Sequence, residues 1–310
     1  MSNILKDKVA IVTGAGRGIG RGIATLMASE GAQVVVVDPG VSVSGSGLDN
    51  SVADEVVMEI QEAGGVAIAC YESVTSMLGG EAIVKAGVDH FGKVDIVVTC
   101  AGILRDRMIF NMSEEEWDDV IDVHLKGTFT VVRHACALFR QQRSGRVITF
   151  SSTSGLYGNS GQANYGAAKD GIAGFIRVVA RDMGKYGVTA NCIAPSAVTR
   201  MTENVPDEAL KIRASSGISG SGVPFTGGVR GNPQDIAPFA TWLASDEAAH
   251  VNGHVFYSSG GLISLLNDPE VVKTIHKEGV WTVEELIKVF PATIGLELYN
   301  PAPPQQQSST

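Results

Sequence analysis

Short apolar runs rich in β-branched residues alternate along the chain with segments of mixed, helix-like polarity. Seven such runs are "VAIVTG" (9–14), "AQVVVVD" (32–38), "VAIACY" (66–71), "VDIVVT" (94–99), "GRVITFSS" (145–152), "VTANCIAP" (188–195) and "HVFYSS" (254–259). Each run is almost continuously apolar, which is typical of strands buried on both faces of a sheet. The pattern predicts a doubly wound α/β fold, with a mostly parallel sheet of about seven strands and helices on both faces.

Three regions interrupt this alternation. Residues 39–50, "PGVSVSGSGLDN", are rich in Gly and Ser and predict a long loop after the second strand. Residues 214–233, "ASSGISGSGVPFTGGVRGNP", have the composition of a lid over a substrate, although a plain surface insertion fits the same composition. The pattern of strands and helices ends near Leu262, so we expect one α/β domain over residues 1–262.

The remaining residues form a separate C-terminal part. We expect an extension with one or two helices over residues 263–300. Within it, Thr282 and Glu285 can form a capping box at the start of a helix. Residues 301–310, "PAPPQQQSST", have no apolar content to bury and predict a disordered tail.

Composition and charge narrow the classes of function. The chain has 310 residues, of which 44% are hydrophobic and 18% charged, and a formal net charge of −9 at pH 7. Without clustered Lys and Arg, this balance makes nucleic acid an unfavourable partner. Cys70, Cys100, Cys136 and Cys192 have no metal-ligand spacing, so we expect reduced thiols and no metal site. We find no signal-peptide pattern and no apolar run of membrane-spanning length, and we expect a soluble, cytoplasmic protein without membrane contact.

The stretch 9–38 places a glycine-rich turn between a strand and a helix. Gly14, Gly18 and Gly20 allow tight turning and close approach of a pyrophosphate, which the free N–H groups of the helix N-terminus stabilise. An ordinary turn between strand and helix is the alternative. Asp38, at the end of the second strand, completes the dinucleotide-binding pattern. The sequence therefore predicts a dinucleotide site in a Rossmann-type domain.

Asp38 and Arg17 bear on which nicotinamide cofactor binds. The Asp38 carboxylate can accept hydrogen bonds from adenosine ribose hydroxyls, whereas it would repel a 2′-phosphate. One such pair of unit charges, at about 4 Å and an effective dielectric near 20, costs roughly 4 kcal/mol. Arg17 in the glycine turn can offset this repulsion. We expect NAD, with NADP as the alternative.

Ser152, Tyr165 and Lys169 form the candidate catalytic group. Tyr165 and Lys169 lie four residues apart on a predicted helix and share one face, and Ser152 ends the fifth strand, at the sheet edge where ligands bind. An adjacent ammonium and a bound cationic nicotinamide both favour the tyrosine phenolate, which takes the proton of a substrate hydroxyl as hydride leaves carbon. Because each residue alone also fits a structural role, the prediction depends on their combination with the glycine turn.

The glycine turn, Ser152, Tyr165-x-x-x-Lys169 and "NCIAP" (191–195) together resemble the short-chain dehydrogenase/reductase family, over residues 5 to about 262. The resemblance implies a homodimer or homotetramer. It also implies that residues 193–199 pass over the nicotinamide, with Val198 near its carboxamide, and that Ser73 and Val74 lie by the adenine. The complete cofactor-binding set is then Gly14, Arg17, Gly18, Ile19, Gly20, Asp38, Ser73, Val74, Ala101, Gly102, Tyr165, Lys169, Pro195 and Val198.

Four further stretches resemble a narrower group within this family. They are "AGILRDRMIFNMSEEEWD" (101–118), "VHLKGTF" (123–129), "GNSGQANYGAAK" (158–169) and "RMT" (200–202). The group comprises the (3R)-hydroxyacyl-CoA dehydrogenase domains of peroxisomal multifunctional enzymes, also called 17β-hydroxysteroid dehydrogenase type 4, and their relatives from bacterial steroid degradation. The resemblance implies an NAD-dependent oxidoreductase that interconverts a secondary alcohol and a ketone. The substrate would be bulky and hydrophobic, a (3R)-hydroxyacyl-CoA or a 17β-hydroxysteroid.

Several positions depart from the broad family and keep alternatives open. Thr99 and Cys100 replace the usual pair of asparagines, and Ser196 replaces a glycine. His124 replaces the catalytic Asn of many members; we include it in the catalytic set, with a packing residue as the alternative. An NADP-dependent 3-oxoacyl reductase and a non-catalytic cofactor-binding protein are the alternative functions.

Two groups of residues are candidates for contact with the substrate. Val223, Pro224 and Phe225 in the lid segment can offer apolar surface. Arg105, Arg107 and Arg230 can meet the phosphates of CoA, although ordinary surface arginines fit equally well.

Overall fold

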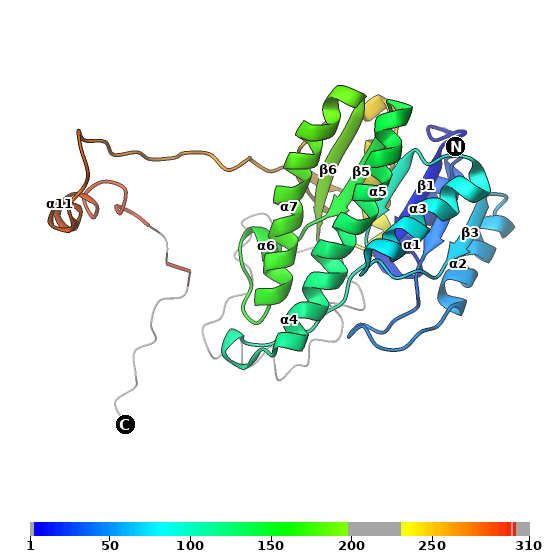
Figure 1. Ribbon diagram of the computed structural model, residues 1–310, viewed down its shortest axis with the longest axis horizontal. Helices are drawn as coiled ribbons and strands as arrows, with labels where there is room; N and C mark the ends of the chain where they lie inside the picture. Colours follow the sequence, from blue (N-terminus) through cyan, green and yellow to red (C-terminus); the bar gives the residue numbers. More distant parts are fainter. Residues whose placement is uncertain (1–2, 198–230, 299, 302–310) are drawn as a thin grey trace. The chain divides into compact units, whose positions relative to one another are not determined.

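One sheet of eight strands forms the centre of the computed structural model, which describes residues 3–197, 231–298 and 300–301 (Figure 1). The strands are β1 (Val9–Thr13), β2 (Gln33–Val37), β3 (Val66–Cys70), β4 (Ile96–Thr99), β5 (Gly145–Phe150), β6 (Val188–Pro195), β7 (Val255–Ser259) and β8 (Leu262–Leu265). Their order across the sheet is β3-β2-β1-β4-β5-β6-β7-β8. All neighbours pair in parallel except β7 and β8. The predicted doubly wound α/β fold is confirmed.

Helices pack on both faces of the sheet. In the unit that carries the sheet they are α1 (Gly18–Ser29), α2 (Ser51–Glu62), α3 (Met77–Phe91), α4 (Glu114–Ile121), α5 (Gly127–Gln142), α6 (Thr153–Leu156), α7 (Ala163–Met183) and α10 (Ala237–Ala244). Side chains of α1, α2 and α10 share one apolar core with the sheet. Side chains of α3, α5 and α7 share a second core with the opposite face.

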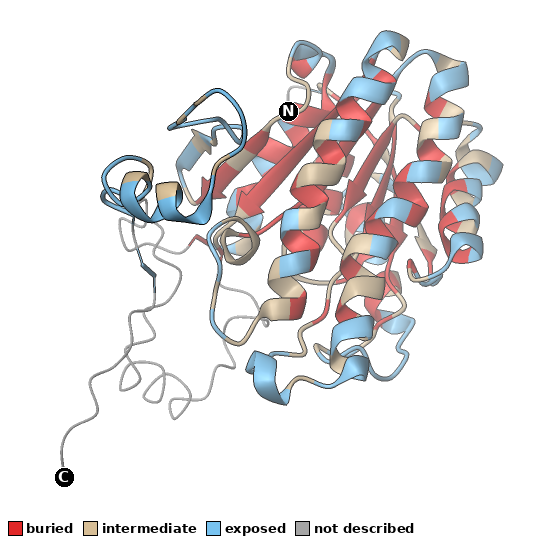
Figure 2. Cartoon of the chain, turned by 60° about the vertical axis from the view of Figure 1, so that its left-hand side comes forward, coloured by how far each residue is buried: buried red, intermediate tan, exposed pale blue. Residues whose placement is uncertain are grey.

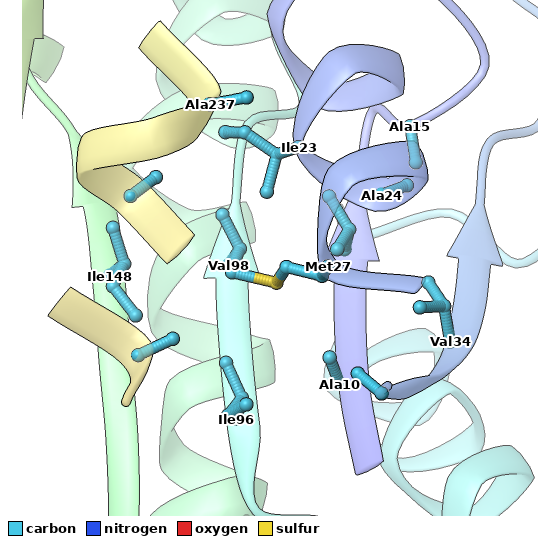
Figure 3. Close-up of a cluster of buried hydrophobic side chains, with 14 of the residues drawn as sticks. Ala10, Ala15, Ile23, Ala24, Met27, Val34, Ile96, Val98, Ile148 and Ala237 are labelled. Atoms are coloured by element: carbon cyan, nitrogen blue, oxygen red, sulfur yellow. The ribbon is translucent and has the colours of Figure 1, made fainter. Parts of the chain in front are cut away.

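Successive side chains of a strand alternate between these two cores, as the pleat of a strand requires. On β1, Ala10 and Val12 belong to the first core and Ile11 to the second. Figure 3 shows the first core, in which Met27 of α1 lies against Val98 of β4. β3 is partly buried and β8 is largely exposed, whereas β1, β2, β4, β5, β6 and β7 are buried along almost their whole length (Figure 2). Burial on both faces explains why their sequences are nearly continuous apolar runs.

β8 is a strand that the seven apolar runs do not include. Gly260 and Gly261 connect β7 to β8, whose residues 262–265 pair antiparallel with 256–259. The sheet therefore has one strand more than the seven predicted runs, and this strand begins at Leu262. Two short apolar runs separated by Gly-Gly are a hairpin signal, and the sequence "SSGGLISL" carries it. The sheet-bearing unit continues to Leu266, and residues from Asn267 onward belong to a second unit.

The second unit has a helix, α11 (Val283–Val289), within its described part. The Thr282 hydroxyl accepts a hydrogen bond from the Glu285 backbone N–H, and the Glu285 carboxylate accepts one from the Thr282 N–H. This confirms the predicted capping box. Of the predicted disordered tail, residues 302–310 lie outside the described residues.

The reversal of strand order between β1 and β4 positions the site. Connections leave β1 and β4 toward opposite sides of this point, and open α/β sheets bind ligands there, beyond the carboxyl ends of the strands. Asp38, Cys100 and Ser152 follow the carboxyl ends of β2, β4 and β5 within two residues. Two of the predicted site residues, Asp38 and Ser152, therefore lie at the same edge of the sheet.

Two negative findings apply to the described ranges. None of the helices there has the length and apolar character needed to cross a bilayer. No group of His, Cys, Asp and Glu side chains there is arranged to hold a metal ion. The four cysteines are free thiols, Cys70 and Cys192 buried and the other two partly exposed.

Candidate active site

The turn from β1 into α1 packs directly on the residue that follows β4. Gly14 has a positive φ of 64°, and a Cβ at this position would lie 2.7 Å from the Cα of Ala101. A Cβ on Gly20 would lie 2.3 Å from the carbonyl oxygen of Gly14. Side chains at either position would force the turn apart, so the glycines permit its close contact with β4.

The N-terminus of α1 has backbone N–H groups that no side chain caps. Its N-cap residue, Arg17, makes no side-chain cap hydrogen bond, and the first turn contains no acidic residue. The first N–H groups of a helix lack partners within the helix, and together with the helix dipole they attract an anion. This geometry fits the pyrophosphate of a dinucleotide, with Gly18, Ile19 and Gly20 in the first turn.

Asp38, directly after β2, forms hydrogen bonds that connect the end of this strand to the glycine turn. One carboxylate oxygen accepts a hydrogen bond from the Gly16 N–H (3.0 Å) and the other from the Gly40 N–H (2.8 Å). The residue is 8% exposed. The guanidinium of Arg17 donates to the Val41 carbonyl at 3.4 Å, in the loop after β2. The structure thus brings Asp38 and Arg17 to the same turn, as the sequence predicts.

Other residues of the predicted cofactor-binding set follow the carboxyl ends of further strands. Ser73 is exposed and Val74 buried after β3, and the Val74 carbonyl accepts a hydrogen bond from Thr130 (2.7 Å). Pro195 is the last residue of β6. Most of the predicted lid lies outside the described residues, as do Val198, Val223, Pro224, Phe225 and Arg230.

Thr99, Cys100 and Ser196, which depart from the pattern of the broad family, form hydrogen bonds at the edge of the sheet. The Thr128 hydroxyl lies 3.4 Å from that of Thr99. Ser196 donates its N–H to the Ser258 carbonyl (2.8 Å), and its own carbonyl accepts a hydrogen bond from the Ser259 hydroxyl (2.9 Å). The Cys100 N–H donates to the Thr13 carbonyl at 3.2 Å. These three residues therefore bond neighbouring segments at the carboxyl ends of β1, β4, β6 and β7.

The structure brings Ser152, Tyr165 and Lys169 together. Ser152 is the N-cap of α6, and its hydroxyl oxygen accepts the Ser154 N–H at 3.1 Å. The same hydroxyl lowers the pKa of Tyr165. Lys169 lies one turn after Tyr165 in α7, with its Nζ 5.6 Å from the centre of the Tyr165 ring. The Lys169 ammonium donates to the Phe150 carbonyl at 2.8 Å, which ties α7 to the end of β5.

Burial controls the protonation of this group. It raises the pKa of Tyr165 to about 12, with a smaller upward contribution from Asp106, while the hydrogen bond from Ser152 acts in the opposite direction. Burial also lowers the pKa of Lys169 to about 8, against the effect of the neighbouring Cys192 and Cys100. Both shifts disfavour the charged forms because a buried charge loses its hydration. Any further charge placed beside Tyr165 acts in a medium of low dielectric constant and has a large effect.

His124 lies in a π-helical turn, Asp122–Lys126, between α4 and α5. It is 2% exposed, and its ring meets the Tyr165 ring edge to face with centres 5.1 Å apart. Burial, and then the positive charge of Lys169, lower its pKa to about 3. Nε2 lies 2.8 Å from the Ile103 carbonyl oxygen and 3.1 Å from the Ile103 backbone nitrogen, whereas Nδ1 has no hydrogen-bond partner among the described residues. A Cβ on Gly102 would lie 2.4 Å from the His124 ring, so Gly102 makes room for this imidazole.

Arg105 and Arg107 are paired with carboxylates of α4. Arg105 forms ion pairs with Glu115 (3.2 Å) and Asp119 (3.1 Å), and Arg107 with Glu116 (2.9 Å). The hypothesis that these arginines meet the phosphates of CoA stays untested. Such a role would require them to exchange these partners.

Asn164, directly before Tyr165, is a residue that the sequence reasoning missed. It is fully buried, and its amide donates to the carbonyls of Arg105 (3.0 Å) and Glu116 (2.8 Å). Its side-chain oxygen accepts the Tyr165 N–H at 2.8 Å. The only local signal is an asparagine in the first turn of a helix, a residue type that often bonds nearby backbone groups.

Comparison with known proteins agrees with this geometry. A family model described as enoyl-(acyl carrier protein) reductase matches residues 14–263. The hydroxyacyl-CoA dehydrogenase ChsB1 of Mycobacterium tuberculosis is 40% identical over 292 residues, which are 91% of this chain and 87% of that protein. Peroxisomal multifunctional enzyme type 2 of Mus musculus is 42% identical over 259 residues, 84% of this chain, but the match spans only 32% of that longer protein.

A solved structure is similar along nearly the whole chain. The crystal structure of a short chain dehydrogenase from Mycobacterium avium has a TM-score of 0.79 and 40% sequence identity, with 97% of each chain covered. The chain therefore belongs to the short-chain dehydrogenase/reductase family.

Proposed function

We propose that this oxidoreductase is an NAD-dependent dehydrogenase that interconverts a secondary alcohol and a ketone on a bulky hydrophobic substrate, a (3R)-hydroxyacyl-CoA or a 17β-hydroxysteroid. The observation that carries the proposal is the group of Ser152, Tyr165 and Lys169 at the same sheet edge as the glycine turn, in which Ser152 and Lys169 are buried and Tyr165 is partly buried. Enzymes of this family bind a nicotinamide cofactor. ChsB1, whose name describes a hydroxyacyl-CoA dehydrogenase, matches 91% of the chain and supports the thioester as substrate.

In the proposed mechanism Tyr165 exchanges the proton of the substrate oxygen. When bound, the cofactor accepts or gives the hydride, and its oxidised ring adds a positive charge that favours the phenolate. Lys169 favours the phenolate in the same way, because its ammonium lies 5.6 Å from the centre of the tyrosine ring. Tyr165 then takes the hydroxyl proton during oxidation and returns it during reduction. Ser152, whose hydroxyl lowers the pKa of Tyr165, holds the reacting oxygen beside the phenol.

His124 acts in this scheme without carrying a proton itself. With a pKa of about 3 it stays neutral, since protonation would place a second cation near Lys169 in a buried site. Ile103 faces Nε2 with both its carbonyl (2.8 Å) and its N–H (3.1 Å), so this one residue holds the ring whether Nε2 donates or accepts. We propose that the neutral ring fixes the position of the Tyr165 ring by its edge-to-face contact.

The cofactor preference rests on Asp38, which has no basic side chain bonded to it in the described structure and whose two oxygens accept backbone N–H groups. An uncompensated carboxylate at this place repels a 2′-phosphate and accepts ribose hydroxyls. Arg17 favours the second candidate, an NADP-dependent 3-oxoacyl reductase, because its guanidinium makes only a long bond of 3.4 Å. We also propose a cytoplasmic homodimer or homotetramer. Exposed apolar side chains on α5 and α7, Phe129 (43%) and Val178 (55%), support self-association.

Replacing Tyr165 by Phe removes the proton-exchanging hydroxyl and should lower kcat by at least about 10²-fold, with NAD affinity retained. The assay follows reduced cofactor with NAD against a 17β-hydroxysteroid and a medium-chain (3R)-hydroxyacyl-CoA, and calorimetry measures NAD binding. Tyr157→Phe, at a partly exposed tyrosine nearby in the chain, is the matched control and should keep full activity. If wild-type protein binds NAD but oxidises neither substrate, the substrate assignment is wrong.

Asp38→Asn removes the negative charge that opposes a 2′-phosphate. We expect the ratio of NADP to NAD affinity to rise at least about 10-fold, since one close charge pair is worth roughly 4 kcal/mol at an effective dielectric near 20. Titration of both cofactors against wild type and variant measures the ratio. A wild-type protein that already binds NADP more tightly would favour the 3-oxoacyl reductase, and Arg17→Ala should then weaken NADP binding selectively.

His124 should make stability depend on pH between about 6.5 and 3. Its pKa is lowered from an ordinary value of 6.5 to about 3, so below pH 6.5 the unfolded chain takes up a proton that the folded protein refuses. The free energy of unfolding should therefore fall as pH falls, by up to about 1.4 kcal/mol per pH unit from this group. Urea unfolding at pH 7 and 5 should show a smaller decrease for His124→Phe than for wild type. The control His90→Gln, at an exposed histidine, should behave as wild type, and equal decreases for all three proteins would contradict the assignment.

A further inference from the structure

Tyr165 stands in a part of α7 that the helix alone holds weakly. α7 begins at Ala163, so Tyr165 is its third residue, and its N–H has no acceptor within the helix. The N-cap residue, Gln162, makes no side-chain cap hydrogen bond. The first turn of a helix frays more readily than its interior. Another group must therefore fix the turn that carries the phenol.

Asn164 supplies the missing bonds from inside the same turn. Its side-chain oxygen accepts the Tyr165 N–H (2.8 Å), and its two amide hydrogens go to the carbonyls of Arg105 (3.0 Å) and Glu116 (2.8 Å). An amide with both hydrogens donated to different segments has one allowed orientation. Because the side chain is fully buried, water cannot replace a lost bond, and each carbonyl left without its partner would lose its acceptor bond inside the protein.

The two carbonyls belong to segments that are anchored in turn. Glu116 is held in the first turn of α4 by its capping box with Ser113 and by the Arg107 guanidinium. The Arg107 N–H donates to the Gly161 carbonyl (2.8 Å), and the Gln162 amide donates to Asp106 (2.9 Å). The loop 103–107, the start of α4 and the start of α7 therefore form one hydrogen-bonded unit around Asn164.

We propose that Asn164 is a positioning residue for Tyr165, holding the first turn of α7 against α4 and the loop 103–107 so that the phenol stays beside Ser152 and Lys169. This inference rests on the proposed function. Its functional consequence follows from geometry, because a displacement of about 1 Å at the reacting atoms can cost 10²-fold in rate. A residue that acts only on stability would leave the rate of the folded enzyme unchanged.

The chain offers a matched control in Asn191 of β6. This side chain is also buried (1% exposed), donates its amide to the Val251 carbonyl at 2.8 Å, and accepts the His254 N–H at 3.1 Å. Asn191→Ala thus removes a comparable buried amide that bonds the segment before β7. It should lower the melting temperature with little effect on catalysis.

The test compares Asn164→Ala, Asn164→Asp and Asn191→Ala in the full chain. Asn164→Asp keeps an oxygen for the Tyr165 N–H but places a carboxylate against two carbonyl oxygens. Below the melting temperature of each variant, we expect both Asn164 variants to lose about 10- to 100-fold in kcat, with KM for NAD unchanged. Asn191→Ala should keep wild-type kcat. Wild-type kcat in either Asn164 variant would overturn the proposal, as would an equal loss in Asn191→Ala.

Hydrogen exchange measured by mass spectrometry separates this proposal from the proposed function. The peptide that covers residues 160–170 should exchange faster in Asn164→Ala than in wild type, and in Asn191→Ala it should exchange as in wild type. Unchanged exchange in Asn164→Ala would overturn the positioning role even if the protein is active. Faster exchange in a protein that oxidises neither the 17β-hydroxysteroid nor the (3R)-hydroxyacyl-CoA would support the role of Asn164 and refute the substrate assignment instead.

Discussion

Burial of the central sheet on both faces is the constraint on which the rest of the structure depends. Because α1, α2 and α10 fill one core and α3, α5 and α7 the other, the central strands are closed to ligands along both faces. Seven strands run in parallel, so their carboxyl ends lie at one edge. The candidate functional side chains Asp38 and Ser152 follow these ends within two residues.

The same burial determines the electrostatics of the site. Tyr165, Lys169 and His124 all have pKa values shifted toward their neutral forms, and in each case loss of hydration is the largest cause. Such a site carries little charge of its own. It responds strongly to the charge of a bound ligand, because charges interact more strongly in a medium of low dielectric constant. In the proposed reaction, ionisation of Tyr165 is thereby coupled to the presence of the oxidised cofactor.

Backbone contacts connect the cofactor side of the site with the catalytic side. The loop 39–50 after Asp38 meets the segment after β4, where the Leu104 N–H donates to the Val43 carbonyl at 2.9 Å. The neighbouring Ile103 bonds His124, whose ring contacts Tyr165. Asn164 then holds the turn that carries Tyr165 against the loop 103–107. The long glycine- and serine-rich loop is therefore part of the support of the site as well as a connection.

The sequence by itself determined the features that depend on local patterns. Periodicity, turn chemistry and helix caps act over a few residues, so the sequence shows the features that depend on them. These features are the strand runs, the glycine turn with Asp38, the spacing of Ser152, Tyr165 and Lys169, and the capping box at Thr282. The β7 to β8 hairpin also carried a local signal in Gly260 and Gly261, which a search for long parallel strands passes over.

Only the tertiary structure decided which side chains these features meet. Asn164 donates hydrogen bonds to carbonyls 59 and 48 residues away in the chain. The His124 ring occupies the space that a side chain at Gly102 would need. Arg105 forms an ion pair with Glu115 of α4. No spacing rule encodes such partners, since they depend on how separate segments pack across the edge of the sheet. Local chemistry thus predicted the candidate reacting groups, and long-range packing fixed their orientation and their protonation.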